Sequence, residues 1–170
     1  MVIFSDYFSN FGINYQIMVQ LTKPDRALLR ILQEDCRITN QDLAERTGMS
    51  TSACWRRVRA LEDAGVISKY VALTDPGAAE LNFRAIVHVS LARTDVDSVR
   101  KFIAEVGQRP EVLQCFAIAG TPDYHLLMVC KDLEEYNRFY DEFLFERSCL
   151  GEVSMHLIMR TIKSTAKLPI

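Results

Sequence analysis

The sequence lacks the features that mark membrane, secreted and disulfide-bonded proteins. No apolar run approaches the roughly 20 residues that span a bilayer, which excludes a membrane helix and a membrane partner. The N-terminus has no basic segment followed by an apolar core, so we expect no secretory signal and a cytoplasmic location. The five cysteines are odd in number and form no C-x-x-C pair, which is typical of free thiols and not of disulfides or a zinc site.

Motifs of known catalytic sites are also missing. The serines have no nucleophile-elbow context, and no glycine-rich phosphate loop is present. Three histidines, His88, His125 and His156, have neither the i, i+4 spacing of a helical metal motif nor an acidic neighbour placed to orient them. Partly buried histidines in a core or an interface explain them more simply. We predict a protein without enzyme activity, metal or cofactor.

Length and composition favour a globular protein of two domains. A chain of 170 residues, 49% hydrophobic and 25% charged, is long enough for one large domain or two small ones. The strongest break is Asp75-Pro76-Gly77, which marks the end of a linker over about residues 71–82. We place an extension at residues 1–20, one domain at 21–70 and a second at 83–170.

Residues 39–70 carry the most informative pattern of the chain. Thr39 or Asn40 can cap a short helix, after which Gly48 permits a sharp turn because it has no Cβ. Ser50 is a good N-cap for the next helix. A further helix should precede this pair, from Pro24-Asp25 to about Arg37.

The helix after Ser50 has two distinct sides. Cys54, Val58 and Leu61 follow the i, i+4, i+7 spacing of a buried face. Gly65 ends the helix, and residues 66–70 have the composition of a strand. A short helix, a turn with glycine and a helix with an outward row of arginines make up the helix-turn-helix of DNA-binding proteins. The alternative is a solvated amphipathic helix with surface arginines.

We predict that the outward side of this helix reads DNA. Arg56 and Arg59 are the best partners for guanine edges, and free N–H groups at the helix N-terminus suit a phosphate. Arg57 lies nearer the buried side, so we assign it to a phosphate or to an ion pair with Glu62 or Asp63. The residues expected on the DNA side are Ser50, Thr51, Ser52, Trp55, Arg56, Arg57 and Arg59.

The charge distribution agrees with this assignment. Residues 22–70 hold nine Lys/Arg against seven Asp/Glu, whereas residues 71–170 hold eleven against fourteen. The basic excess is therefore confined to the first domain. Because it is small, we expect a monomer to bind DNA weakly and a dimer or larger homo-oligomer to gather enough phosphate contacts.

The second half predicts a βαββαβ domain. Apolar residues alternate in the expected strands and recur at helical spacing between them. This order corresponds to a ferredoxin-like sheet with both helices on one face, so the chain is α+β: a winged helix-turn-helix followed by a ferredoxin-like domain. The expected elements are strands at 84–93, 111–119, 124–130 and 153–162, and helices at 95–108 and 133–144.

The free face of this sheet is a predicted interface. It is too apolar for open solvent and too polar for a monomer core, so a back-to-back dimer of sheets would cover it. Residues 1–20 carry aromatic side chains at near-helical spacing, which suits either a helix packed on a neighbouring subunit or a loose extension. The residues expected on the free face are Ile86, His88, Ser90 and Ala92 of the first strand and Ser154, His156, Ile158 and Arg160 of the last.

Several segments resemble one family. The run Ser50–Ile67, with Arg56-Arg57-Val58, Leu61-Glu62 and Gly65-Val66-Ile67, is similar to the DNA-binding domain of the leucine-responsive/asparagine-responsive (Lrp/AsnC) transcription regulators. Leu21–Gln33, Arg37 and Gly120–Tyr124 match that family too. The resemblance covers the chain from about residue 21 onward. It implies a C-terminal domain that dimerises and binds amino acids.

The loop Gly120-Thr121-Pro122-Asp123-Tyr124 is the predicted effector site. N–H groups near Gly120 would hold a carboxylate, while the Asp123 carboxylate or strand-end carbonyls would receive an ammonium group. The alternative is a turn chosen for its geometry alone. In the family, the matching loop contributes to the amino-acid pocket at a contact between dimers.

The last strand affects the expected identity of the effector. Where relatives tend to place small hydroxyl residues, this chain has Met155 and His156 after Ser154. A ligand other than leucine is therefore expected, such as a larger, aromatic or sulfur-containing amino acid.

Two other functions stay open. One is a sensor that has lost DNA binding. The other is a tetrapyrrole (siroheme-type) decarboxylase, because such enzymes resemble the family in architecture and rely on histidine and arginine. In this chain those residues would be the three histidines and Arg160.

Overall fold

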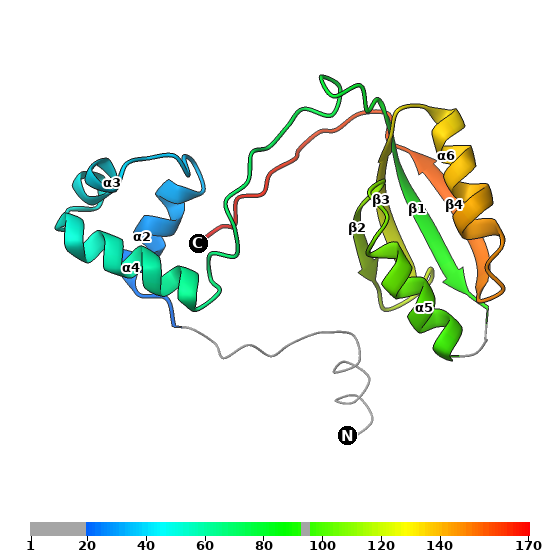
Figure 1. The fold of residues 1–170 in the computed structure, drawn as a ribbon, viewed down its shortest axis with the longest axis horizontal. Helices are drawn as coiled ribbons and strands as arrows, with labels where there is room; N and C mark the ends of the chain where they lie inside the picture. Colours follow the sequence, from blue (N-terminus) through cyan, green and yellow to red (C-terminus); the bar gives the residue numbers. More distant parts are fainter. Residues whose placement is uncertain (1–19, 93–95) are drawn as a thin grey trace. The chain divides into compact units, whose positions relative to one another are not determined.

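The computed structural model describes residues 20–92 and 96–170, which form two compact units. The first unit holds the described residues up to Ala72 together with Thr165–Ile170, and the second holds Leu73–Ser164 (Figure 1). The expectations for residues 1–19 lie outside the described part.

Within residues 20–72, three helices build the first unit, each with a side-chain N-cap. Thr22, Thr39 and Ser50 each accept a hydrogen bond from the backbone N–H three residues later, as their types predict. Gly48 ends the middle helix in the left-handed region at φ 67°, which confirms the expected turn. The helices are α2 (Lys23–Leu32), α3 (Asn40–Thr47) and α4 (Thr51–Asp63).

The first helix is shorter than predicted. It was expected to reach about Arg37, but α2 ends at Leu32. The Arg37 N–H instead donates to Oδ1 of Asp35 at 2.8 Å. A local bond from an aspartate to the backbone competes with the helical pattern and favours a turn.

The core of the first unit lies where the three helices meet. Leu28, Leu43, Ala44 and Cys54 are buried there, and Val58 packs against them. This confirms the buried side that was predicted for α4. Burial of each of these larger apolar side chains stabilises the unit by about 1.5–3 kcal/mol.

The strand expected at residues 66–70 is absent. The described residues 64–82 contain no strand, although Gly65 does follow α4 in the left-handed region at φ 69°. A strand needs a hydrogen-bonded partner, and the described part of the chain places none beside this segment. Strand composition alone was therefore misleading here.

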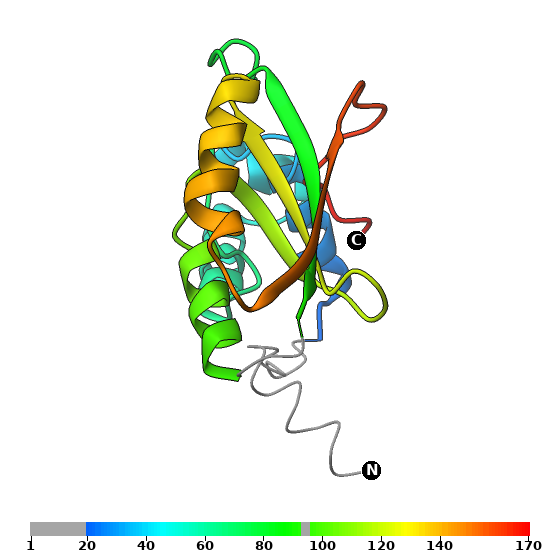
Figure 2. The same cartoon turned by 90° about the vertical axis from the view of Figure 1, so that its right-hand side faces the viewer.

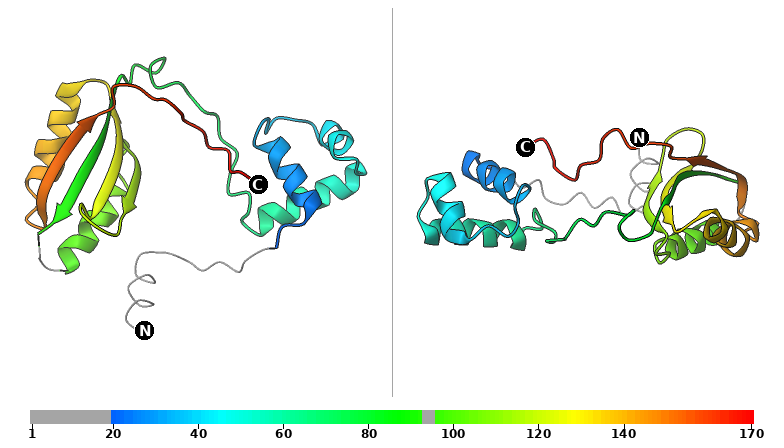
Figure 3. Two further views of the ribbon diagram at one scale, coloured as in Figure 1. Left: turned by 180° about the vertical axis from the view of Figure 1, so that it is seen from behind. Right: turned by 90° about the horizontal axis from the view of Figure 1, so that it is seen from above.

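The second unit is a four-stranded antiparallel sheet in the order β2-β3-β1-β4, with α5 and α6 on one face (Figure 2). The view from above in Figure 3 shows the same two helices on one side of the strands. This is the predicted ferredoxin-like arrangement. Its elements are β1 (Phe83–Leu91), α5 (Val96–Val106), β2 (Val112–Ala117), β3 (Tyr124–Cys130), α6 (Leu133–Phe139) and β4 (Leu150–Leu157).

The core of the second unit lies between the sheet and these helices. Val87, Val89, Leu126 and Met128 point to the helices and are fully buried, with Phe102 of α5 among them. The alternate residues of the same strands form the other face. The period-2 pattern of the sequence was therefore correct about which residues face which way.

Two details differ from the expected elements. The last strand lies earlier than predicted, at Leu150–Leu157 and not at 153–162, which leaves Met159 and Arg160 outside it. The last helix continues beyond Phe139 as a π-helix, η1 (Tyr140–Phe145), so that both Phe143 and Leu144 are buried. The i→i+5 spacing turns the chain less per residue, which keeps adjacent apolar residues on the core side.

Residues 165–170 were assigned to the second domain, but the structure groups them with the first unit. The side-chain amide of Gln33 both donates to the Leu168 carbonyl at 3.3 Å and accepts the Leu168 N–H at 2.5 Å. Nε of Arg30 donates to the Ile170 carbonyl at 2.6 Å. Arg30 and Gln33 bind backbone groups of the segment, and Nζ of Lys167 lies 3.9 Å from Oε1 of Glu34. Contacts to backbone groups leave no pattern in the side chains of the segment.

Across the part of the chain that the structure describes, every helix is too short or too polar to cross a membrane.

Candidate DNA-binding and effector sites

The outward side of α4 is exposed, as predicted. Ser52, Arg56, Arg59 and Asp63 are all exposed, and 60% of the surface of Trp55 is accessible. Arg56 and Arg59 lie about one turn apart on a single helix face, and a guanidinium is the group that most often donates to guanine edges in the major groove. This side of α4 can therefore present donors to DNA.

The start of α4 is fixed by its neighbours. Ser50 Oγ accepts the Ala53 N–H at 3.3 Å, and Nδ2 of Asn40 in α3 donates to the Thr51 carbonyl at 3.0 Å. Thr51 and Ser52 stay exposed. A helix N-terminus with exposed hydroxyl side chains has the chemistry to receive a phosphate.

Arg57 has a different partner from the two that were predicted. Its Nη1 lies 2.8 Å from Oδ1 of Asp25 in α2, and not beside Glu62 or Asp63. Asp25 also closes the capping box with Thr22. Arg57 therefore joins two helices, because it projects from the side of α4 that faces α2. The sequence gives no sign of this contact between residues 32 positions apart.

The pKa of Asp25 reflects this environment. Burial of the carboxylate favours the neutral form, but the hydrogen bonds from Thr22 and the ion pair with Arg57 outweigh that effect. The pKa of Asp25 consequently lies below its usual value.

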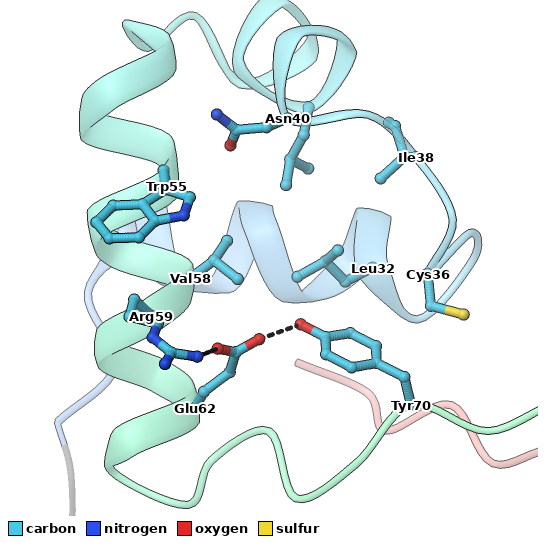
Figure 4. A pocket seen from close by; sticks show the side chains of 10 residues that line it. Leu32, Cys36, Ile38, Asn40, Trp55, Val58, Arg59, Glu62 and Tyr70 are labelled. Carbon is cyan, nitrogen blue, oxygen red and sulfur yellow. Dashed lines mark hydrogen bonds and ion pairs between the residues drawn. The ribbon is translucent and has the colours of Figure 1, made fainter.

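Arg59 belongs to a chain of polar contacts beside a hollow of about 470 Å³ in the first unit (Figure 4). Arg59 Nη1 lies 3.0 Å from Oε2 of Glu62, and the Tyr70 hydroxyl donates to the other carboxylate oxygen, Oε1, at 2.9 Å. Sequence reasoning missed Tyr70 entirely. The spacing of Arg59 and Glu62, three residues apart on a helix, was the available signal for the first of these contacts.

The predicted effector loop is tied to β1 through Asp123. Oδ2 of Asp123 accepts the Leu91 N–H at 2.7 Å, and the Asp123 N–H donates to the Val89 carbonyl at 3.0 Å. Gly120 has a φ of 129°, which side chains rarely tolerate, and its surroundings are open. One carboxylate oxygen of Asp123 therefore has a structural task, and Gly120 supplies a backbone shape available mainly to glycine.

The residues expected to complete the effector site do not share one face of β4. Ser154 pairs with His88, and His156 with Ile86, on the sheet face away from the helices. Met155 pairs with Val87 and packs against the core. The start of β4 and the loop nevertheless lie at the same end of the sheet, since Val89 pairs with both Tyr124 and Val153.

The three histidines come together on that same sheet face. The His88 ring stacks on His125 with centroids 4.2 Å apart and lies 4.5 Å from His156. Burial first, and then the neighbouring His125 and His156, lower the pKa of His88. We call these three residues the histidine cluster. The sequence placed each of them on a strand, but only the pairing register brings them into contact.

A metal site does not follow from this proximity. Across residues 20–92 and 96–170, no group of three His, Cys, Asp or Glu side chains is arranged to hold a metal ion. All five cysteines are free thiols.

Comparison with known proteins gives consistent matches over both units. The model of a winged helix-turn-helix DNA-binding domain matches residues 21–68, and that of the Lrp/AsnC ligand binding domain matches residues 84–168. The chain is 32% identical over 152 residues to the transcriptional regulator AzlB of Bacillus subtilis (strain 168), which covers 89% of this chain and 97% of that protein. It is 35% identical over 150 residues to the DNA-binding transcriptional activator DecR of Escherichia coli (strain K12), covering 88% and 99%.

Solved structures agree with these matches. A transcriptional regulator of Neisseria meningitidis, crystallised in complex with L-methionine, superposes with a TM-score of 0.84 at 36% identity. The superposition covers 88% of this chain and 97% of that one.

Proposed function

Because the chain belongs to the Lrp/AsnC family of transcriptional regulators, we propose that it recognises specific DNA sites through α4 and that an amino acid controls this binding. The observation that carries the proposal is the exposed pair Arg56 and Arg59 on a helix whose start is capped by Ser50.

Each residue on the outward side of α4 has a role that suits its chemistry. Arg56 and Arg59 would read guanine edges, because a guanidinium can donate to two acceptors at once. The N-terminal hydroxyl residues Ser50, Thr51 and Ser52 would contact phosphate, and Trp55 offers an apolar surface to a thymine methyl group or a sugar. Arg57 would instead hold α4 in place through Asp25.

The proposed effector is an amino acid held by the loop Gly120–Tyr124. Open backbone near Gly120 suits its carboxylate, and the Asp123 carboxylate suits its ammonium group. L-methionine is the first compound to test, because the Neisseria regulator is known in complex with it and a sulfur-containing ligand was expected from Met155 and His156.

The protein would act as a homo-oligomer built on the face of the sheet that carries the histidine cluster. That face includes the apolar residues Ile86, Leu127 and Phe116, the last of which is 52% exposed. A second copy would cover them. A dimer also doubles the modest basic excess of the first unit, which supports binding to paired half-sites in the cytoplasm.

We infer a binding function and not an enzymatic one. The histidine cluster is the observation that keeps the decarboxylase alternative worth testing, since His88, His125 and His156 converge. A pigment titration separates the two, because a tetrapyrrole enzyme would change the Soret absorption on binding its substrate, whereas the proposed regulator would not.

The test of DNA recognition is a binding assay at fixed salt with the DNA upstream of the chain's own gene. Arg56→Ala and Arg59→Ala should each lower the preference for specific over random DNA by about 5- to 150-fold, the value of one bidentate base contact. Arg100→Ala is the matched control, because it removes the same charge from an exposed position on α5. Unchanged selectivity in both α4 variants would refute the proposal.

A further inference from the structure

The Arg59 guanidinium forms an ion pair with the Glu62 carboxylate, and this carboxylate also accepts a hydrogen bond from Tyr70. Glu62 uses its two oxygens for different partners: Oε2 binds Arg59 at 3.0 Å and Oε1 accepts the Tyr70 hydroxyl at 2.9 Å. Figure 4 shows the three side chains in a row, with Arg59 and Glu62 on α4 and Tyr70 reaching in from the segment after that helix. A carboxylate bound at both oxygens cannot rotate freely, so its position defines that of Arg59.

The Arg59–Glu62 ion pair contributes little to stability. An exposed i, i+3 pair on a helix stabilises by only about 0.2–0.5 kcal/mol, and the Arg59 side chain is 61% exposed. Its importance is geometric. A free arginine side chain samples many rotamers, and fixing it before DNA arrives removes part of the entropy that binding would otherwise lose.

The guanidinium keeps donors for DNA while it is held. An arginine has five N–H groups, and within the described residues Arg59 contacts Glu62 through Nη1 alone. The remaining donors can meet the two acceptors of a guanine edge. The contact with Glu62 therefore orients the Arg59 guanidinium and leaves its other N–H donors available for DNA.

Tyr70 is suited to be a constant anchor. Burial, followed by the hydrogen bond to Glu62, raises the pKa of Tyr70 to about 12. Its hydroxyl thus remains a donor throughout the physiological range. Tyr70 also lies two positions before Ala72, where the first unit ends, so the anchor sits on the segment that leads to the second unit.

We propose that Tyr70 and Glu62 are positioning residues that set which base Arg59 selects. This inference rests on the proposed recognition of DNA by α4. Its consequence is that sequence preference at one base position depends on a tyrosine outside the recognition helix. Any change in the segment at Tyr70 would alter that preference without touching α4.

The experiment measures base preference at every position of a bound site, using a randomised DNA library and the full chain. Tyr70→Phe removes the hydroxyl alone, so it should reduce discrimination by about three- to tenfold, the effect of one hydrogen bond, only at the position that Arg59→Ala also affects. The double variant Tyr70→Phe/Arg59→Ala should match Arg59→Ala, because the anchor has nothing left to position. Tyr140→Phe, in the second unit, is the control for the chemical change.

The outcomes separate the two proposals. If Arg59→Ala changes one position and Tyr70→Phe changes none, the positioning role is refuted while DNA recognition by α4 stands. If Tyr70→Phe lowers base discrimination equally at all positions and also lowers the melting temperature, the positioning role is refuted and Tyr70 has a structural role. If neither Arg56→Ala nor Arg59→Ala alters any preference, the proposed function fails as well. Glu62→Gln gives a second measure, and its effect should fall on the same position as that of Tyr70→Phe.

Discussion

Arg57 of α4 and Asp25 of α2 form an ion pair that fixes the recognition helix to the first helix of the unit, with Nη1 2.8 Å from Oδ1. The carboxylate is the more buried partner, since 13% of its side chain is exposed against 39% for the arginine. Asp25 is at the same time part of the capping box of α2. One side chain therefore supports both the start of one helix and the placement of another.

Asp25→Asn should destabilise the first unit. A hydrogen bond to a charged group contributes about 1.5–3 kcal/mol, and the exposure of Arg57 reduces this to an expected loss of about 1–2 kcal/mol. Urea unfolding followed by Trp55 fluorescence measures the change. Arg46→Gln is the matched control, because its pair with Glu34 lies in the same unit, is 49% exposed on the arginine side and should cost less than about 0.5 kcal/mol. Equal effects of the two substitutions would contradict the role of Asp25.

The same carboxylate predicts how acid affects the first unit. The pKa of Asp25 in the folded protein is lowered, whereas in the unfolded chain it is about 3.9. Asp25 therefore contributes stability that is fully present above about pH 4–5 and is lost as the pH falls through the lower, folded value. Urea midpoints between pH 6 and pH 3 should decline less steeply in Asp25→Asn than in the unchanged chain. Parallel curves would show that other carboxylates account for the decline.

Local patterns predicted most of the fold. The residue types of Thr39, Gly48 and Ser50 favour a helix N-cap, a left-handed turn and a second N-cap, and the helix-turn-helix was predicted from them. The alternation in Tyr124–Cys130 likewise fixed β3 to the residue. Such features depend on neighbours within a few positions, which a sequence displays directly.

Contacts between distant residues were the part that the sequence could not supply. The partner of Arg57 is 32 positions away, and the anchor of Glu62 lies beyond the end of its helix. The histidine cluster needed the register of three strands. The error at residues 66–70 has the same origin, because β-branched residues make a strand only where a partner strand exists.

The histidine cluster predicts a second, milder pH dependence. His88 has a lowered pKa in the folded protein, so below the unfolded value of about 6.5 the unfolded chain binds more protons and stability falls with decreasing pH. His125 and His156 lie against the His88 ring and are among the causes of this shift. Ser154 and Phe116, the cross-strand neighbours, bring no charge to compensate.

Thermal unfolding and sedimentation at pH 7.5 and pH 5.5 measure this effect. We expect a lower melting temperature at pH 5.5 and, if the sheet face joins two copies, a shift toward smaller species. His88→Asn removes the central imidazole and should flatten both changes. A variant with the pH dependence of the unchanged chain would assign the effect to other groups.

The proposed effector site makes Asp123 the critical residue, and the structure shows how to separate its two tasks. Asp123→Ala removes both the acceptor for the Leu91 N–H and the charge for an ammonium group. Asp123→Asn keeps a carbonyl oxygen for Leu91 and loses only the charge. The asparagine variant is therefore the informative one, and the alanine variant reports the structural contribution of the loop.

We expect Asp123→Asn to retain the melting temperature and basal DNA binding of the unchanged chain while weakening the binding of L-methionine by about tenfold or more, the usual effect of losing a charged hydrogen bond. Titration calorimetry against L-methionine and a panel of other amino acids measures the affinity, and sedimentation with and without the bound amino acid measures the assembly.

An effector that binds one assembly better shifts the population toward it, and the acidic second half has no excess of positive charge to place against DNA phosphates. The effector should therefore act by changing the spacing of recognition helices on successive half-sites, and Asp123→Asn should abolish the change in mass. Full amino-acid affinity in this variant would remove Asp123 from the site, and an effector-dependent change in DNA affinity with identical mass distributions would defeat the quaternary mechanism.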